Sequence, residues 1–437
     1  MPETVGVVSL GCAKNRVDSE QMLGILSNLG YSITQKPEEA QILIVNTCGF
    51  IESAKQESID ALLEMAKFKK SGHCLLLIAT GCLVQRYVDD LYQEIPEIDA
   101  FIGVSEYPRL PEMIGQAKKK RRPVACEPSL AIFEGPRVLT TPSFSAYVRI
   151  GEGCDHCCSY CAIPSIRGPY RSRAYANLLA ECCVLSSKGV SEITFIAQDT
   201  ARYGDDLFSR KRLSDLITDT CAMDSVHWVR VLYCHPDHVG EALLDALANE
   251  PKACGYLDMP IQHIDSEVLR AMNRRGGPDA IHALIKKARE RNLTFRTTLM
   301  VGFPGETDAA FEKLLRFVQE IRFDRMGAFV YSAEEGTKAF DMPDQVPEEV
   351  KRERLDRLMR LQAQISLEIN RKRAGEVAET LIEREYNGKY IGRTQKEAPE
   401  GDGVIWVHSE KLLLPGTYVR VRMTRADRYD MAGEALT

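Results

Sequence analysis

Three apolar runs near the N-terminus each end close to a cysteine, and no other feature of the sequence restricts the fold as much. The runs span residues 5–10, 42–45 and 75–79, and the cysteines that follow them are Cys12, Cys48 and Cys82. Continuous apolar runs of this length are typical of strands buried on both faces of a parallel sheet. Segments of helical period separate the runs, so the order is βαβαβ. We therefore predict a flavodoxin-like parallel α/β domain with all three cysteines at one edge of the sheet.

These three cysteines can be interpreted in two ways. Taken singly, each is more typical of buried filler, because free cysteine is among the most buried residue types. Three of them after successive parallel strands indicate a shared site instead. Three soft thiolates without a nearby histidine favour an iron–sulfur cluster with one open iron. Phosphate or flavin binding is the alternative at such an edge, and the lack of a glycine-rich phosphate loop in the sequence there weakens it.

A second group of cysteines follows the predicted strand 146–150. Cys154, Cys158 and Cys161 have the spacing CxxxCxxC. Three thiolates this close together can hold one corner of an iron–sulfur cube and leave its fourth iron open to a small molecule. Zinc is the sharpest alternative, because Cys157 completes two CxxC pairs, but structural zinc sites separate their pairs by about a dozen residues or more. Four buried structural cysteines are the remaining alternative, and Cys157 is treated as a bystander.

From residue 143 onward, strands and helices alternate again. The predicted strands are 146–150, 193–197, 228–233, 256–260, 295–301 and 328–331. Six βα units predict a partial (β/α) barrel that binds its ligands at the carboxyl ends of the strands. Gln198, Gly302, Gly305 and Glu306 lie at such ends and are candidates for binding an adenosine-like ligand. Ordinary strand–helix turns and helix caps are the alternative for these residues.

The C-terminal part has a different character. A helical segment, 348–373, precedes short alternating runs at 378–382, 404–407 and 418–423, which predict a small antiparallel β-barrel. Such barrels often bind RNA through a basic, aromatic face, but residues 372–437 carry eleven Lys/Arg and eleven Asp/Glu. Recognition of a protein loop fits this balance better. The candidate contact residues are Tyr386, Tyr390, Trp406, Tyr418 and Tyr429, of which at least half are expected to be core.

Four segments follow from these changes along the chain. We expect an N-terminal cluster domain at 1–122, a linker at 123–142, a central domain at 143–371 and the small barrel at 372–437. The net charge of −6 gives no overall positive field toward nucleic acid. No stretch reaches the roughly 18 apolar residues of a membrane span, and the N-terminus lacks a basic leader region. Clustered cysteines then indicate metal in a reducing compartment, so we expect a cytoplasmic protein.

Taken together, these motifs resemble the radical S-adenosylmethionine methylthiotransferases. CxxxCxxC with Tyr160 before its last cysteine resembles the radical S-adenosylmethionine enzymes. The three earlier cysteines and the small barrel are similar to the cluster domain and the TRAM domain of the methylthiotransferases. Segments 46–58, 81–86, 327–332 and 334–337 resemble the RimO type, which modifies an aspartate of ribosomal protein S twelve. The resemblance covers essentially the whole chain.

The resemblance implies two 4Fe-4S clusters, one on each cysteine triad, and S-adenosylmethionine as a further cofactor. The second cluster would bind S-adenosylmethionine and cleave it to a radical that takes hydrogen from the β-carbon of the aspartate. The first cluster would carry the sulfur, methylated by a second S-adenosylmethionine. Tyr160 would lie near the adenine, with 302–306 lining the same pocket. The implied partners are ribosomal protein S twelve and an electron donor such as flavodoxin or ferredoxin, with no membrane and no direct nucleic-acid binding expected.

Two rival functions stay open. The tRNA-adenosine methylthiotransferases share both clusters, and the balanced charge of the C-terminal segment argues against them only weakly. A non-catalytic electron carrier with two clusters is a rival of another class. Carriers use fully ligated clusters, whereas two sites with three cysteines each leave an open iron and favour chemistry.

Overall fold

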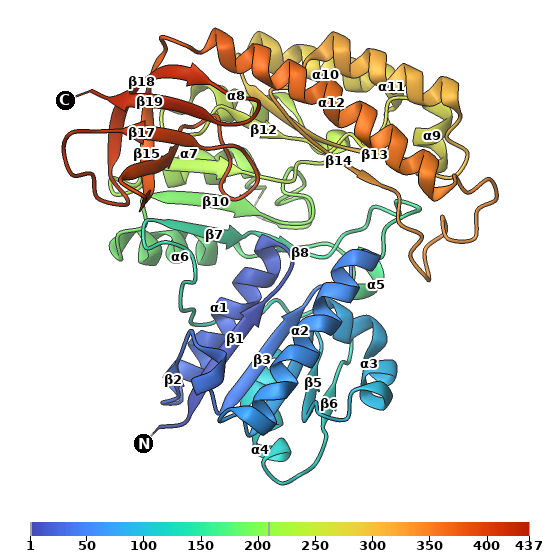
Figure 1. Ribbon diagram of the computed structural model, residues 1–437, viewed down its shortest axis with the longest axis vertical. Helices are drawn as coiled ribbons and strands as arrows, with labels where there is room; N and C mark the ends of the chain where they lie inside the picture. Colours follow the sequence, from blue (N-terminus) through green and yellow to red (C-terminus); the bar gives the residue numbers. More distant parts are fainter. Residues whose placement is uncertain (1, 209, 437) are drawn as a thin grey trace.

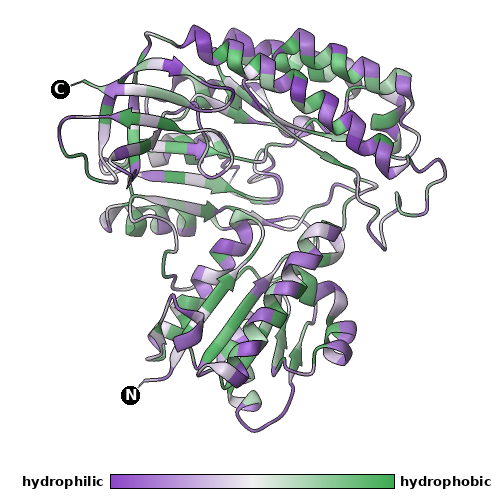
Figure 2. Cartoon of the chain, viewed as in Figure 1, coloured by the Kyte–Doolittle hydropathy of each residue, from purple (hydrophilic) through white to green (hydrophobic). Residues whose placement is uncertain are grey.

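The computed structural model describes residues 2–208 and 210–436, and its three parts follow one another along the chain (Figure 1). An N-terminal α/β domain, drawn in blue and teal, lies at one end of the molecule. A central domain and a small C-terminal barrel lie side by side at the other end. Figure 2 shows apolar residues gathered on the strands of the N-terminal sheet. Within the described residues, no helix is long and apolar enough to cross a membrane.

The N-terminal domain is a parallel sheet with the strand order β2-β1-β3-β4-β5-β6. The first five strands have the flavodoxin-like order, so this prediction is confirmed. The buried apolar runs form β3 and β4, and the two-residue edge strands β2 and β6 were not predicted. The elements are β1 (Thr4–Ser9), α1 (Ala13–Asn28), β2 (Ser32–Ile33), β3 (Ile42–Thr47), α2 (Glu52–Ser71), β4 (Leu76–Gly81), α3 (Cys82–Glu94), β5 (Ala100–Ile102), α4 (Leu110–Ala117) and β6 (Val124–Ala125).

The central domain is an open barrel of six parallel strands. Two sheets, β7-β10-β11 and β12-β13-β14, are joined by backbone hydrogen bonds from Cys254 N to Val229 O (2.8 Å) and from Cys234 N to Asp258 O (2.9 Å). Each predicted strand overlaps one of these, so the predicted partial barrel is confirmed. The strands are β7 (Ser145–Arg149), β10 (Glu192–Ile196), β11 (Trp228–Val231), β12 (Tyr256–Asp258), β13 (Thr294–Val301) and β14 (Arg325–Val330).

Helices cover the outside of this barrel (Figure 1), and a short antiparallel pair of strands, β8 and β9, follows β7. This pair was not predicted, because each of its strands has only two residues. The elements are β8 (Gly151–Glu152), α5 (Ile163–Arg167), β9 (Arg171–Ser172), α6 (Tyr175–Ser187), α7 (Leu213–Cys221), α8 (Glu241–Asn249), α9 (Ser266–Ala271), α10 (Gly277–Glu290), α11 (Asp308–Ile321) and α12 (Glu348–Lys372).

The C-terminal strands close a barrel in the order β15-β16-β17-β19-β18, as predicted for a TRAM-like or OB-like fold. One detail of the prediction is wrong, because β17 and β19 pair in parallel. The chain reverses twice between them, so β19 runs in the same direction as β17 when it lies beside it. The strands are β15 (Val377–Tyr386), β16 (Lys389–Arg393), β17 (Ile405–His408), β18 (Tyr418–Ala426) and β19 (Met431–Ala435).

A buried ion pair fixes the C-terminal barrel to the central domain. Arg393 on β16 donates to both oxygens of Glu192 on β10, at 3.1 and 2.6 Å. Both residues are almost fully buried. Tyr418 packs edge-on against Trp228 next to this pair, with ring centroids 4.9 Å apart. The contact therefore combines a charge pair with an aromatic core.

Candidate functional site

The first cysteine triad lies at the carboxyl edge of the N-terminal sheet. Cys12 and Cys48 follow β1 and β3, which are neighbours in the sheet, and Cys82 follows β4 on the other side of β3. In a sheet of this order, ligands bind at the switch point between β1 and β3, outside the carboxyl ends of the strands. The three predicted ligands therefore share the edge at which this fold binds small groups.

Two glycines let the loops of this triad approach one another. A Cβ on Gly11 would lie 2.9 Å from Cys48 Cβ and 3.0 Å from Cys48 Sγ, and Gly11 has a φ of +86°. A Cβ on Gly49 would lie 2.7 Å from Leu83 Cα, directly after Cys82. A larger residue at either position would push the cysteine loops apart. The close approach fits a set of thiols that converge on one small group.

The surroundings of the first triad suit an anionic metal cluster. Cys12 is the N-cap of α1, and Cys82 is the first residue of α3. The free N–H groups and the dipole at helix N-termini stabilise negative charge. Without metal, burial raises the pKa of the Cys82 thiol to about 12 and raises that of Cys48 as well. Metal binding must displace these protons, because thiolates are the ligands.

The second triad lies on the loop after β8. Cys161 N donates to Cys158 O at 3.0 Å, which closes a turn, and Cys154 N donates to Gly168 O at the same distance. The thiols of this triad are half-buried, whereas Cys157 is exposed. Burial raises the pKa of Cys161 to about 12 and that of Cys154 to about 11. Three free thiols on one tight loop fit the corner of an iron–sulfur cube.

One short segment contacts both triads. Arg167, the last residue of α5, places a guanidinium nitrogen 3.7 Å from Cys82 Sγ. The next residue, Gly168, accepts the N–H of Cys154. The two cysteine sites belong to different domains, and this dipeptide connects them directly.

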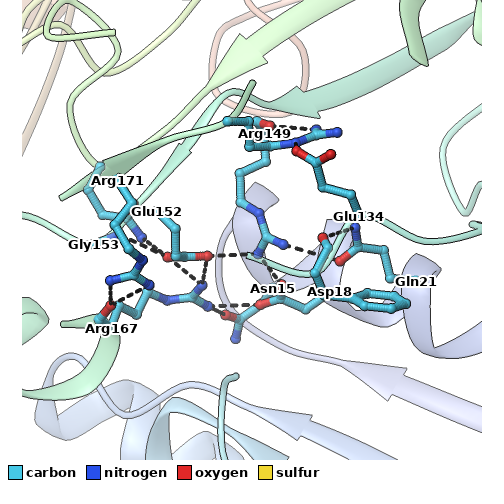
Figure 3. A network of polar contacts seen from close by, with 12 residues as sticks. Asn15, Asp18, Gln21, Glu134, Arg149, Glu152, Gly153, Arg167 and Arg171 are labelled. Carbon is cyan, nitrogen blue, oxygen red and sulfur yellow. Dashed lines mark hydrogen bonds and ion pairs between the residues drawn. The ribbon is translucent and has the colours of Figure 1, made fainter. Parts of the chain in front are cut away.

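Arg167 belongs to a buried network of charges between α1 and the central domain (Figure 3). It donates to both oxygens of Glu152 at 3.1 Å and to Asp18 Oδ2 at 2.9 Å. Arg149 pairs with Asp18 and, at 2.8 Å, with Glu152. Asn15 Oδ1 accepts from Arg167 at 2.8 Å. Two arginines and two carboxylates thus neutralise one another, each less than a tenth exposed.

The network holds α1 against the loop of the second triad. Burial by itself would raise the pKa of Glu152, but Arg167 and Arg149 outweigh it and lower the pKa to about 2. The carboxylate is therefore charged at neutral pH. A buried charge network contributes to a defined arrangement only when each member is paired. Cys12, at the start of α1, is thereby placed relative to Cys154, two residues after Glu152.

Tyr160 and the 302–306 loop, two elements of the predicted S-adenosylmethionine pocket, are neighbours. Tyr160 packs edge-on against Phe303, with ring centroids 6.4 Å apart. Arg274 donates to the Tyr160 hydroxyl at 3.4 Å and lies 3.9 Å from Cys158 Sγ. Gly302 and Gly305 both have positive φ, +74° and +79°. The second cysteine loop and the turn after β13 therefore form one contact region.

Glu306 supports this turn from within. Its carboxylate accepts the N–H of Gly302 at 2.8 Å and pairs with Arg354 at 2.9 Å, and its side chain is fully buried. Burial raises its pKa to about 6, although Arg354 acts in the opposite direction. The structure thus gives Glu306 a role in shaping the loop that the sequence did not predict.

Gln198 lies at the end of β10, next to the charge network. Its Nε2 donates to Glu152 Oε1 at 2.9 Å. Its buried Oε1 has no hydrogen-bond partner among the described residues. An unpaired buried acceptor is costly, so Gln198 can serve a ligand that carries a donor group.

Three imidazoles surround Asp199 beside the second triad. Asp199 Oδ2 lies 3.0 Å from His156 Nε2 and 2.6 Å from His238 Nδ1, and the rings of His156 and His235 stack at 3.7 Å. Burial opposes the charge of Asp199, but the histidines lower its pKa below the ordinary range. The cluster ties the cysteine loop to the loops after β10 and β11.

Lys14 and Tyr233 meet where α1 contacts the central barrel. Lys14 Nζ lies 3.3 Å from the centroid of the Tyr233 ring. Burial lowers the pKa of Lys14, and the charges of Cys12, Asp258 and Glu152 act in the opposite direction. Tyr233 has a φ of +67° and follows β11, at the carboxyl edge of the barrel.

The sequence did not reveal Lys14, Asp18, Glu152 or Arg167 as part of this region. Charged residues next to a cysteine motif are usually solvated, and their burial depends on domain docking. The one available signal was their position, within six residues of a predicted ligand: Lys14 and Asp18 follow Cys12, Glu152 precedes Cys154, and Arg167 follows Cys161.

Family models match three stretches of the chain. They are an uncharacterized protein family, UPF0004, at residues 4–103, the radical SAM superfamily at 148–318 and the TRAM domain at 374–436. These stretches contain, in order, the first triad, the second triad and the C-terminal barrel.

Similar proteins cover the full length. The chain is 46% identical over 437 residues to a protein of Heliobacterium modesticaldum named ribosomal protein uS12 methylthiotransferase RimO, covering 99% of this chain and 95% of the relative. A protein of Geobacter sulfurreducens with the same name is 45% identical, covering 100% and 99%. Among solved structures, the radical S-adenosylmethionine methyltransferase TsrM from Kitasatospora setae has a TM-score of 0.57 at 14% identity and covers 90% of this chain and 81% of its own. That likeness concerns the fold.

Proposed function

The chain belongs to the RimO family of radical S-adenosylmethionine methylthiotransferases, and we propose that it transfers a methylthio group to the β-carbon of an aspartate in ribosomal protein uS12, the S twelve protein named above. The observation that carries the proposal is the pair of cysteine triads, one in each of two domains, joined through Arg167 and Gly168. In the reaction proposed, one site would cleave S-adenosylmethionine and the other would supply the sulfur.

We propose that each triad holds one 4Fe-4S cluster, so that the chain carries two. Cys12, Cys48 and Cys82 would hold the first, and Cys154, Cys158 and Cys161 the second. The donor sets fit this assignment, because each offers three free thiols and none of the described cysteines forms a disulfide. When bound, the second cluster supplies the electron that cleaves S-adenosylmethionine and starts the radical chemistry. Abstraction of a hydrogen atom from an unactivated C–H bond requires a radical, because no acid–base pair can break such a bond usefully at neutral pH.

The residues of the chain have binding and positioning roles in this scheme. Tyr160 would line the adenine side of the pocket, and Gly302 and Gly305 would let the backbone approach the cofactor. Gln198 would accept a hydrogen bond from it through its unpaired Oε1. Glu306 remains a predicted cofactor-binding residue that acts, by its contacts, through the shape of the loop.

We propose that the C-terminal barrel, at 372–437, recognises a protein loop. Tyr386 and Tyr429 are 55% and 43% exposed and lie where a partner can reach them. Tyr390 is buried and Tyr418 packs on the central domain, so these two have core roles. Trp406 packs edge-on against Tyr386, with ring centroids 6.3 Å apart. Binding should therefore depend weakly on salt, unlike phosphate recognition.

The domain boundaries, the electron donor and the cellular compartment complete the proposal. We propose that the units 1–122 and 143–371, joined by the segment 123–142, each carry one cluster. Strand β6 extends the first sheet to Ala125, three residues into the segment expected to be a linker. A flavodoxin or ferredoxin would deliver electrons in the cytoplasm.

The test combines an in vitro reaction with a comparison of substrates. Anaerobically reconstituted full-length protein is mixed with S-adenosylmethionine, dithionite and either isolated uS12 or bulk tRNA. Mass spectrometry should find one added methylthio group on a uS12 aspartate. Methylthiolated adenosine in tRNA, with unmodified uS12, would favour the tRNA enzymes instead. S-adenosylmethionine left uncleaved would favour an electron carrier.

A further inference from the structure

The fold buries the amino group of Lys14 without a carboxylate partner. The residue is 7% exposed. Across residues 2–208 and 210–436, no ion pair and no hydrogen bond engages its ammonium group. The ammonium lies instead over the ring of Tyr233, 3.3 Å from its centroid. Desolvation of an ammonium costs far more than one cation–π contact returns, so the contact with Tyr233 alone does not hold Lys14 in its charged form.

The neighbouring carboxylates are already engaged by other groups. Asp258 accepts the N–H of Tyr233 at 2.9 Å and pairs with Arg296 at 2.8 Å. Glu152 is held by Arg167 and Arg149 within the charge network. Neither is free to neutralise Lys14. The other group whose charge acts on Lys14 is the Cys12 thiol, which is assigned to the first cluster, so no neighbouring carboxylate is left to pair with Lys14.

The position of Lys14 indicates where an anionic partner would lie. Lys14 follows Cys12 by two residues, in the first turn of α1. Tyr233 follows β11, at the carboxyl edge of the central barrel, where barrels of this kind bind their substrates. The ammonium thus lies between the first cysteine triad and the substrate edge of the second domain.

We infer that Lys14 binds the carboxylate of the substrate side chain, an inference that rests on the proposed function. An aspartate places its carboxylate next to the carbon that receives the sulfur. An ion pair with Lys14 would fix that carbon between the two domains. An adenosine base has no such charge, so Lys14 also selects a protein substrate over tRNA. Lys14 is a binding and specificity residue in this scheme and takes no proton or electron.

The test is a double-mutant cycle between Lys14 and the target aspartate. Binding of isolated uS12, with the target aspartate intact or replaced by asparagine, is measured by calorimetry to full-length reconstituted enzyme. The enzyme is wild type, Lys14→Met, which keeps the apolar stem, or Lys14→Arg, which keeps the charge. Lys188→Met removes the same charge from an exposed helix end and serves as the matched control.

Lys14→Met should weaken binding of intact uS12 about 10- to 100-fold, because a desolvated charged pair is lost. It should leave binding of the asparagine form within about twofold of wild type, and Lys14→Arg should recover part of the loss. Lys188→Met should change neither affinity. Iron content and the electron paramagnetic resonance of both clusters should stay as in wild type for Lys14→Met.

Other outcomes overturn the inference in distinguishable ways. Equal weakening toward both forms of uS12 would mean that Lys14 only supports the fold. Unchanged binding with a shifted spectrum of the first cluster would mean that Lys14 offsets the charge of the cluster. If Lys14→Met loses iron, the comparison of wild type with Lys14→Arg decides, and wild-type enzyme that binds the aspartate and asparagine forms of uS12 equally well refutes the inference. Wild-type enzyme that cleaves S-adenosylmethionine but never modifies uS12 refutes the proposed function itself.

Discussion

Replacing Glu192 with glutamine should weaken the contact between the C-terminal barrel and the central domain and lower the free energy of unfolding. Glu192 accepts two hydrogen bonds from Arg393, lies 3.6 Å from Arg230 and accepts a third bond from Ser145 at 3.0 Å. A glutamine keeps the size of the side chain but leaves the two arginines buried with one negative charge fewer. The substitution therefore tests the charge pair without creating a cavity.

The size of the effect follows from the pKa of Glu192. Burial would raise it, but Arg393 and Arg230 lower it from 4.5 to about 2. At about 1.4 kcal/mol per pH unit, this difference corresponds to about 3 kcal/mol of stability. This value agrees with the typical cost of breaking a buried ion pair, which is about 3–5 kcal/mol. Because the folded-state pKa is the lower one, the contribution is complete above pH 4.5 and is lost as the pH falls toward 2.

Tryptophan fluorescence can follow this contact during urea unfolding of the apo-protein. The sequence has two tryptophans, Trp228 at the contact itself and Trp406 in the barrel. Glu192→Gln should lower the free energy of unfolding by about 3 kcal/mol at pH 7. Glu379→Gln is the matched control, because Glu379 pairs with His227 at 2.8 Å across the same contact but both side chains are more than 40% exposed. It should cost less than about 1 kcal/mol.

Two results would refute this reasoning. A difference between wild type and Glu192→Gln below about 1 kcal/mol at pH 7 would mean that desolvation cancels the pairing. A difference that grows as the pH falls from 4.5 would mean that the carboxyl group is not held in its charged form.

Three further predictions concern the clusters. Reconstituted wild type should contain about eight irons, and joint replacement of Cys154, Cys158 and Cys161 by alanine should leave about half by iron assay; complete loss would mean that the first triad is no independent site. Cys157→Ala should keep all iron and activity, because its thiol is exposed, and a loss of half would show that the ligand assignment is wrong. Arg167→Lys should lower the midpoint potential of the first cluster in a redox titration, because a hydrogen bond to Cys82 Sγ is lost; a change confined to the second cluster would contradict this.

The sequence predicted those parts of the fold that depend on local pattern. Apolar runs such as 42–45 and 75–79 became the fully buried strands β3 and β4, because a strand covered on both faces has no polar alternation. The two-residue strands β2, β6, β8 and β9 carry no such pattern, because they are too short and are defined by pairing with their neighbours. The parallel pairing of β17 with β19 likewise depends on tertiary closure rather than on any turn signal.

The residues of the candidate site likewise fall into those that a local pattern predicted and those that depend on tertiary structure. The six cysteines were recognisable because spacing and strand position are local properties. Arg167, Glu152 and Asp18 were not, because each looks like an ordinary surface charge until the two domains dock. Lys14 is the extreme case, since its burial depends on domain docking and the anion that we infer for it lies outside the chain. The sequence shows that these charged residues exist. Which of them are paired depends on how the two domains dock and can be seen only in the structure.

The first half of α1 explains why these roles occur together. Cys12 caps the helix toward the first cluster site, Lys14 lies over Tyr233, and Asn15 and Asp18 reach Arg167 from positions three residues apart. Residues three apart lie on one face of a helix, so Asn15 and Asp18 meet the network together, while Lys14 projects to the side of the barrel. Any rotation of α1 would break the network and move Cys12 and Lys14 at the same time. The charge network therefore determines the positions of both Cys12 and Lys14 relative to the central domain.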